Sequence, residues 1–243
     1  MRVFGKGRYR ARRAETQHDI EATQRLRHLA FRNCEGIDTD RFDEICHHIM
    51  VEEVKSGLLV ACYRFMPLAG GDEIGQSYSA QFYDLLALQS FPGPMVEIGR
   101  FCLQPGLHDP DILRVAWGAL TRFVDQEGVE LLFGCSSFPG TRPEAHSDAF
   151  AWIRDRHLAP ERWQPRVKAP EVFRFSTQPR RKPDARRALL AMPPLLRTYL
   201  GMGGWVSDHA VIDTGMNTLH VFTALEVKSV PAARARALRA VAG

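Results

Sequence analysis

The stretch MVEIGRFCLQ, residues 95–104, decides how the rest of the chain is interpreted. Most of its side chains are apolar, as in a strand buried on both faces, but Glu97 and Arg100 interrupt the run. Charges inside a core strand cost several kcal/mol unless each is paired or faces a cleft. The two charges therefore mark either a buried structural ion pair or a site where a proton is removed and an anionic group is held. The remaining sequence favours the second interpretation.

The composition is that of an ordinary globular protein. The 243 residues are 45% hydrophobic and 25% charged, and this length suits a single domain, which we place over residues 1–243. No apolar run is long enough to span a bilayer, and the N-terminal residues lack the apolar core of a signal peptide, so we expect a cytoplasmic protein. The 5 cysteines are scattered without CxxC spacing, so we expect neither a disulfide framework nor a metal site.

Basic residues gather in three clusters, although the net charge is only +4. Such clusters suit an acidic protein, an anionic membrane surface or nucleic acid. A solvated tail is the alternative for each cluster, and we favour it for the third. The clusters are Arg2, Lys6, Arg8, Arg10, Arg12 and Arg13; Arg180, Arg181, Lys182, Arg186 and Arg187; and Arg234, Arg236 and Arg239.

Hydrophobic periodicity predicts helices alternating with the strands of one central mixed sheet, an α/β (α+β) class. The proline-rich stretch 159–184 is expected to be an excursion or mobile loop, and 159–200 a basic insertion. Thr16 is the predicted N-cap of the first helix. Helices are predicted over residues 15–32, 82–88, 109–126, 145–156 and 194–200, and strands over 9–14, 49–54, 58–66, 95–104, 131–135 and 219–227.

The order of these elements resembles the GNAT acyltransferase fold, and the front half resembles the acyl-homoserine-lactone synthases. The matching residues are an Arg and a Phe four apart in the first helix, paired aspartates, a hairpin arginine and the central Glu-x-x-Arg-Phe. In this sequence they are Arg27, Phe31, Asp40, Asp43, Arg64, Glu97, Arg100 and Phe101. The tryptophan that these synthases carry shortly after the Phe is replaced here by Ile37, which argues against formation of a homoserine lactone.

The back half resembles the ornithine lipid Nα-acyltransferases. The motifs are FGCSSFPGT at 133–141, HLAP at 157–160 and MPPLLRTYLGMGGWVSDHAVID at 192–213, and the resemblance covers Tyr9 to about Leu225. It implies transfer of a 3-hydroxyacyl chain from acyl carrier protein to the α-amine of ornithine, which forms lyso-ornithine lipid. The alternatives are a glutamine Nα-acyltransferase and, behind it, an acyl-homoserine-lactone-type signal synthase.

The segment after the central strand favours a carrier protein over free coenzyme A as acyl donor. A GNAT enzyme that uses coenzyme A places a glycine-rich loop here to bind the pyrophosphate. This chain has LQPGLHDPDIL at 103–113, with a single glycine and with Asp109 and Asp111, which repel a pyrophosphate. We therefore expect no tightly bound cofactor, only the acyl-phosphopantetheine of acyl carrier protein. The basic clusters would attract that acidic partner.

The implied reaction is attack of an amine on a thioester, which needs a base. Glu97 is our first candidate, and the alternative is that it only orients Arg100. Asp43 is the second candidate, although we expect it to bind the ammonium group together with Asp40. Guanidinium groups bind carboxylates and phosphates bidentately, which makes three arginines candidates for substrate binding. They are Arg27, which could equally be an exposed helix residue, Arg64 and Arg100.

Several neighbouring residues complete the predicted site. A backbone amide near Cys102 or Leu103 is the expected donor to the oxyanion. Ser136 and Ser137 are expected to contact substrate or pantetheine, or else to cap the following helix. Aromatic side chains line either an acyl tunnel or the core. These are Phe31, Phe138 and Trp205, while Phe101 and Cys102 belong to the substrate-binding set.

Residues 180–200 place basic side chains beside leucines and Met192. This pattern fits a surface on anionic lipid, with the protein peripheral on the inner face of the cytoplasmic membrane, and it fits a carrier-protein docking face equally well. We expect no nucleic-acid partner. A non-catalytic basic module that binds RNA or membrane is the competing class of function, and it leaves Glu97, Asp43 and Arg100 unexplained.

Overall fold

The structure, a computed structural model, describes residues 4–242, so Arg2 of the first basic cluster lies outside the described residues. The chain divides into two compact units of interleaved segments. Unit 1 comprises Met1–Pro67, Ile98–Val129 and Ala232–Gly243, and unit 2 comprises Leu68–Glu97 and Glu130–Pro231. The expectation of a single domain over residues 1–243 stays a prediction.

The sheet of unit 1 contains β1, β2, β3 and β4 in antiparallel order, followed by the later part of β6. The predicted hairpin is confirmed as β3 and β4. The strand predicted at 9–14 is β2, and it is not the edge of the sheet, because β1 pairs with it on the side away from β3. The strands are β1 Phe4–Lys6, β2 Tyr9–Arg13, β3 His47–Glu53, β4 Leu59–Leu68 and β6 Met95–Leu103.

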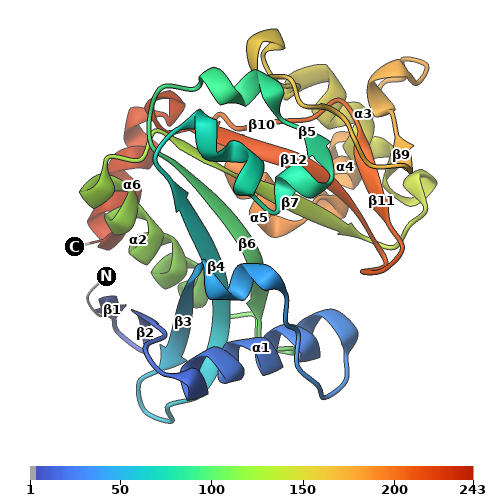
Figure 1. The fold of residues 1–243 in the computed structure, drawn as a ribbon. Coiled ribbons are helices and arrows are strands. Elements are labelled where there is room, and N and C mark those ends of the chain that lie inside the picture. The colour runs from blue at the N-terminus through green and yellow to red at the C-terminus, as the bar shows by residue number, and fades with distance from the viewer. Residues whose placement is uncertain (1–3, 243) are drawn as a thin grey trace. The chain divides into compact units, whose positions relative to one another are not determined.

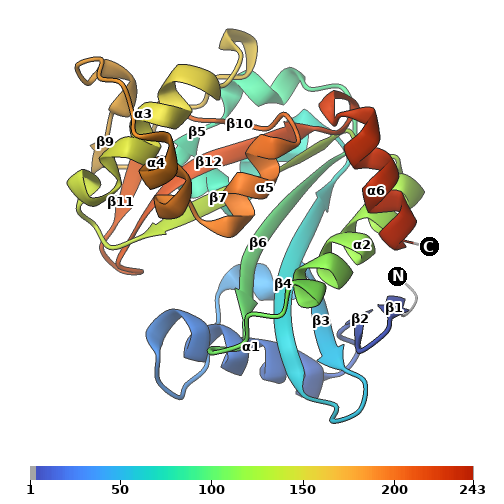
Figure 2. The same cartoon turned by 180° about the vertical axis from the view of Figure 1, so that it is seen from behind.

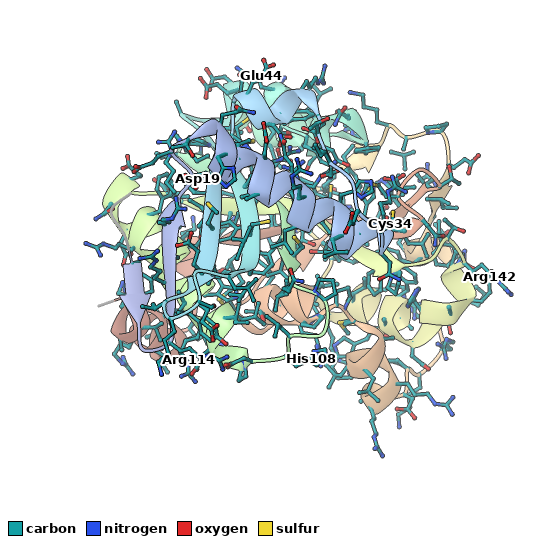
Figure 3. The ribbon with its side chains drawn as sticks, turned by 90° about the horizontal axis from the view of Figure 1, so that it is seen from below. Asp19, Cys34, Glu44, His108, Arg114 and Arg142 are labelled. Carbon is teal, nitrogen blue, oxygen red and sulfur yellow. The ribbon has the colours of Figure 1, made fainter. Side chains whose placement is uncertain are left out.

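Helices α1 (Gln17–Arg32) and α2 (Pro110–Glu127) cover opposite faces of β3 and β4 (Figures 1 and 2). Strand alternation explains this, because Cys62 packs against α1 while the Tyr63 hydroxyl donates to a carbonyl of α2. As predicted, Thr16 caps α1, and its capping-box partner is Asp19 (Figure 3). Gly128 ends α2 with the positive φ of 63° that a left-handed C-cap requires.

The C-terminal basic cluster lies on a helix, α6 (Ala232–Ala242), and not on a solvated tail. α6 lies beside α2 (Figures 1 and 2), and Arg239 pairs with Asp125 of α2 at 2.9 Å. Gly118 of α2 permits close packing, since a Cβ there would lie 2.7 Å from the Phe4 ring and 3.0 Å from Val241. The favoured interpretation of this cluster as a tail is therefore wrong.

The sheet of unit 2 is ordered β6-β7-β12-β11-β9, with β10 also paired to β12. β6 and β7 are parallel and the other neighbours antiparallel, which confirms the predicted mixed sheet. A second sheet joins β5 to β8. The strands are β5 Tyr83–Asp84, β7 Leu131–Pro139, β8 Arg166–Val167, β9 Val172–Phe173, β10 Trp205–Val206, β11 Ala210–Asp213 and β12 Thr218–Glu226.

Helices α3 (Ser147–Arg156), α4 (Ala185–Ala191) and α5 (Pro194–Gly201) lie on one face of β7 and β12 (Figure 2). Phe138, Phe150, Leu196 and Val221 join in the core between this face and the helices. No helix within residues 4–242 is long and apolar enough to cross a bilayer.

Two predicted segments differ from the structure. Residues 159–184 are not a simple loop excursion, because β8 and β9 pair into sheets and Phe175 is buried in the core. Residues 82–88 are not a helix, because Tyr83 and Asp84 form β5. Short 3-10 turns occur in both regions: η4 Leu86–Ser90, η6 Glu161–Trp163 and η7 Phe175–Thr177. The others are η1 Arg41–Glu44, η2 Gly71–Gln76, η3 Ser79–Gln81, η5 Pro143–His146 and η8 Val227–Ser229.

Candidate active site

Three arginines and three aspartates of unit 1 form a closed ring of alternating charges, which we call the Arg–Asp ring. Each member hydrogen-bonds the next, and the last returns to the first. The order is Arg27, Asp38, Arg100, Asp40, Arg64 and Asp43.

The ring is held by charge-assisted hydrogen bonds. Arg27 donates from Nε to Asp38 Oδ2 at 2.8 Å and from Nη1 to Asp43 Oδ1 at 2.7 Å. Arg100 donates from Nε to Asp38 Oδ2 at 3.1 Å and from Nη2 to Asp40 Oδ2 at 3.0 Å. The opposite charges compensate one another, as buried charges must.

Arg64 closes the ring with a bidentate contact. Its Nη1 and Nη2 donate to Asp40 Oδ1 and Oδ2 at 2.6 and 2.7 Å, and its Nη1 also donates to Asp43. Arg27 is only 1% exposed, so the alternative of an exposed helix residue is wrong. Sequence reasoning missed Asp38 as a member; its signal was its spacing of two and five residues from Asp40 and Asp43.

Local structure places the ring members. Asp40 caps η1 and Asp43 completes its capping box, so both carboxylates are fixed at the start of that turn. Arg100 has a φ of 54° inside β6, a left-handed conformation that is uncommon for a residue with a side chain. Such a conformation costs on the order of 1–3 kcal/mol and persists where surrounding contacts fix it, here the hydrogen bonds to Asp38 and Asp40.

The ring lowers the pKa of Asp40 and Asp43. Burial alone would raise the pKa of Asp43, but hydrogen bonds from Arg27 and the charges of Arg27 and Arg64 outweigh it and lower this pKa to about 2. Burial alone would also raise the pKa of Asp40, but the hydrogen bonds from Arg64 and the charges of Arg64 and Arg100 outweigh it and lower this pKa. A carboxylate with so low a pKa is a weak proton acceptor at neutral pH, which disfavours Asp43 as a general base.

Glu97 lies in unit 2 and is held by a different kind of contact. Its Oε1 accepts hydrogen bonds from the Ser79 amide at 2.7 Å and hydroxyl at 2.6 Å, and its Oε2 accepts one from the Tyr78 amide at 2.7 Å. We call this arrangement the Glu97 turn. Glu97 is 5% exposed, and the Ser79 hydroxyl also lies 3.4 Å from the Cys135 sulfur. Sequence reasoning missed Ser79, because a serine in a loop gives no recognisable pattern.

Ser136 and Ser137 lie on opposite faces of β7, as successive strand residues do. Ser136 is buried and its Oγ accepts a hydrogen bond from Thr223 at 2.9 Å. Ser137 is exposed and lies opposite His220 of the neighbouring strand β12. Register places Ser137 on the same face as Glu97, because Glu97 pairs with Phe133, four residues before Ser137. Neither serine caps a helix, so that alternative is wrong.

A second buried polar group lies beside Ser137 on this face. The Tyr83 hydroxyl donates to the His220 carbonyl at 2.8 Å, and the His220 ring packs edge-on against Phe82. Burial lowers the pKa of His220 to about 4, so the imidazole is neutral at neutral pH.

The remaining predicted residues pack against apolar groups. Cys102 is buried with its sulfur 3.5 Å from that of Cys62, and Phe31 packs against the same cluster. The Phe101 ring stacks on Tyr63 with centroids 5.3 Å apart. Of the residues proposed for an acyl tunnel or the core, Phe138 belongs to the core under the helices, and Trp205 is buried beside Phe222. No cluster of three or more metal-ligating side chains occurs within residues 4–242.

Comparison with known proteins places this geometry in a family. Residues 9–118 match the family model described as an acetyltransferase (GNAT) domain. The L-ornithine N(alpha)-acyltransferase of Rhodobacter capsulatus is 31% identical over 238 residues, which cover 91% of each chain. The chain belongs to the L-ornithine N(alpha)-acyltransferase family. The Brucella abortus member is 28% identical over 247 residues, covering 94% of this chain and 88% of its own.

The family membership confirms that the chain is an enzyme, an acyltransferase. Its GNAT-like fold also matches FeeM, an N-acyl amino acid synthase from uncultured soil microbes. That structure aligns with a TM-score of 0.50 over 97% of both chains at 10% identity, which shows likeness of fold alone.

Proposed function

We propose that this enzyme transfers a 3-hydroxyacyl chain from acyl carrier protein to the α-amine of ornithine. The observation that carries the proposal is the similarity to L-ornithine N(alpha)-acyltransferases along nearly the whole chain. The Arg–Asp ring is compatible with it: ornithine carries charges of both signs, and the ring combines guanidinium and carboxylate groups, which pair with one another in the structure.

In the proposed reaction the ornithine amine attacks the thioester carbonyl, and Glu97 accepts a proton from the nitrogen directly or through water. A backbone amide near Cys102 or Leu103 stabilises the oxyanion. The intermediate then collapses, so that the amide bond forms, the carbon–sulfur bond breaks, and the departing pantetheine thiolate is protonated. Asp43 suits the role of base less well than Glu97, because two arginines lower the pKa of Asp43 to about 2.

The start of α2 supports a carrier-protein donor. The Asp109 carboxylate accepts a hydrogen bond from the Asp111 amide at 3.0 Å, and Asp111 adds a second carboxylate in the first turn. Two acids therefore stand at a helix N-terminus whose amides would otherwise attract the pyrophosphate of coenzyme A. A carrier-protein phosphopantetheine has a single phosphodiester and does not need this pyrophosphate site.

The test is product analysis by mass spectrometry. The purified chain is incubated with 3-hydroxyacyl carrier protein and, separately, ornithine, glutamine, lysine or S-adenosylmethionine, and each reaction is repeated with 3-hydroxyacyl coenzyme A. We expect the mass of Nα-acylornithine, formed faster from the carrier protein. If acylglutamine or a homoserine lactone were the main product, the proposal of ornithine as the acceptor would be overturned. Faster turnover with 3-hydroxyacyl coenzyme A would overturn the proposed donor.

A further inference from the structure

Helix α4 presents two adjacent leucines to solvent. Leu189 is 43% exposed and Leu190 is 72% exposed. The opposite side of the helix is fixed, because Ala188 and the following Met192 are buried in the core of unit 2. Asp184 caps the helix by accepting a hydrogen bond from the Arg187 amide at 3.0 Å. The two leucines are therefore held outward by a folded element.

The same helix and the segment before it carry exposed positive charge. Among residues 4–242, no ion pair is formed by four basic residues of this cluster, whereas Arg181 pairs with Asp148 at 2.9 Å. The four residues are Arg180, Lys182, Arg186 and Arg187.

The N-terminal basic cluster differs, because acids from other elements pair with its Arg8, Arg10 and Arg12. Arg8 pairs with Glu53 at 2.5 Å, and Arg12 pairs with Asp19 at 2.7 Å and with Glu52 at 2.8 Å. The sequence of this cluster contains no acidic residue, but β3 and α1 supply acidic partners. The charge of α4 and its leading segment is thus exposed and largely unpaired, and it lies beside two exposed leucines.

We propose that the α4 surface, formed by Lys182, Arg186, Arg187, Leu189 and Leu190, binds an anionic lipid bilayer. Arg186 and Leu190 are four residues apart and lie on one side of the helix. The arginine can therefore contact a phosphate headgroup while the leucine enters the hydrocarbon beneath it. The two protruding leucines gain from transfer into hydrocarbon, and the basic residues gain from the anionic headgroups. This inference rests on α4 and does not depend on the proposed reaction.

Vesicle flotation of the full chain tests the proposal without any assay of activity. We expect binding to phosphatidylcholine vesicles that contain phosphatidylglycerol, weak binding to phosphatidylcholine alone, and release at high salt. The double variant Arg186→Gln/Arg187→Gln should lower the partition coefficient about 25-fold, since each basic residue near the surface contributes about fivefold. Leu189→Ser/Leu190→Ser should lower it by more than about tenfold.

Two control variants match these changes elsewhere on the surface. Arg234→Gln/Arg236→Gln removes two exposed arginines of α6, and Leu86→Ser removes a leucine that is 60% exposed. Both should bind like the wild type, and circular dichroism should show all variants folded. No binding to anionic vesicles at low salt, or unchanged binding in both α4 variants, would overturn the proposal. If the α4 variants kept wild-type binding to vesicles but lost binding to acyl carrier protein, the α4 surface would be assigned to that protein instead.

Discussion

The Arg–Asp ring of unit 1 and the Glu97 turn of unit 2 both bury carboxylates, but they hold them with different partners. Every aspartate of the ring hydrogen-bonds guanidinium groups, and the pKa of Asp43 falls to about 2. Glu97 accepts its hydrogen bonds from two backbone amides and the Ser79 hydroxyl, which orient the carboxylate without adding formal charge.

The difference separates two chemical tasks. Guanidinium partners keep a carboxylate in its charged form, so that the carboxylate can stabilise the fold or bind a cation. Amide and hydroxyl donors also favour the charged form of a carboxylate, but they act through partial charges and not formal ones. We therefore interpret the ring as a binding and scaffolding element and Glu97 as the candidate base, and both roles stay predictions.

The largest effect that tests this comparison is expected from Arg27→Met. The change leaves the half-buried Asp38 and Asp43 without their shared, fully buried partner, which should lower the free energy of unfolding by about 3 kcal/mol. Urea denaturation measures it. The control Arg25→Met removes an exposed arginine of the same helix and should change stability by less than about 0.5 kcal/mol. Equal, small losses in both variants would mean that the ring contributes nothing to folding.

The next effect concerns catalysis. Glu97→Gln keeps the size of the side chain but removes the proton acceptor, so kcat should fall by about 10²–10⁴-fold. Steady-state kinetics with the carrier-protein donor measures it, and thermal unfolding confirms that the variant is folded. Glu127→Gln, an exposed glutamate of α2, is the control and should keep wild-type turnover. Near wild-type kcat in both Glu97→Gln and Glu97→Ala would remove Glu97 from the role of base.

Strongly periodic segments with recognisable caps could be predicted from the sequence. α1 starts one residue after the Thr16 cap, and α2 ends at Gly128, because local signals and packing agree there. Residues 159–184 could not be predicted, since β8 and β9 have two residues each and form only by pairing with β5 and β11. Likewise the apolar run at 82–88 does not distinguish a helix from a strand until Tyr83 is buried against His220.

The site divides in the same way. Five ring members were named from the sequence: Arg100 because a charge inside an apolar strand stands out, and the other four through the resemblance to acyl-homoserine-lactone synthases. Asp38 and Ser79 were missed, because their partners Arg27, Arg100 and Glu97 come from distant parts of the chain. Whether these residues act on substrate stays a prediction.

A smaller effect separates the two units by pH. The pKa of His220 is near 6.5 in the unfolded chain and about 4 in the folded protein, where it is buried in unit 2. Between pH 4 and pH 6.5 the unfolded state therefore binds more protons at His220 than the folded state does. Its contribution to stability is complete above pH 6.5 and should fall by about 2 kcal/mol between pH 7 and pH 5. For Asp43, with a lowered pKa, the contribution is present above pH 4 and lost between about pH 4 and 2.

Urea denaturation at several pH values measures both losses. His220→Gln should flatten the stability curve between pH 7 and 5, although His48, whose pKa burial also lowers, retains a slope of the same sign. Asp43→Asn should keep the loss above pH 5 and change the curve below pH 4. If His220→Gln leaves the upper slope unchanged, His220 is not the group that makes unit 2 sensitive to mild acid.

The smallest effect compares the two faces of β7. Ser136→Ala removes the acceptor for the Thr223 hydroxyl and should lower the free energy of unfolding by about 1 kcal/mol with the KM for the acyl donor unchanged. Ser137→Ala should change stability by less than about 0.5 kcal/mol, because Ser137 is exposed. Ser137 shares the face of Glu97, so it is the serine whose loss should raise that KM. A raised KM in Ser136→Ala alone would place the donor on the face that α3, α4 and α5 cover, and it would separate the donor from the Glu97 turn.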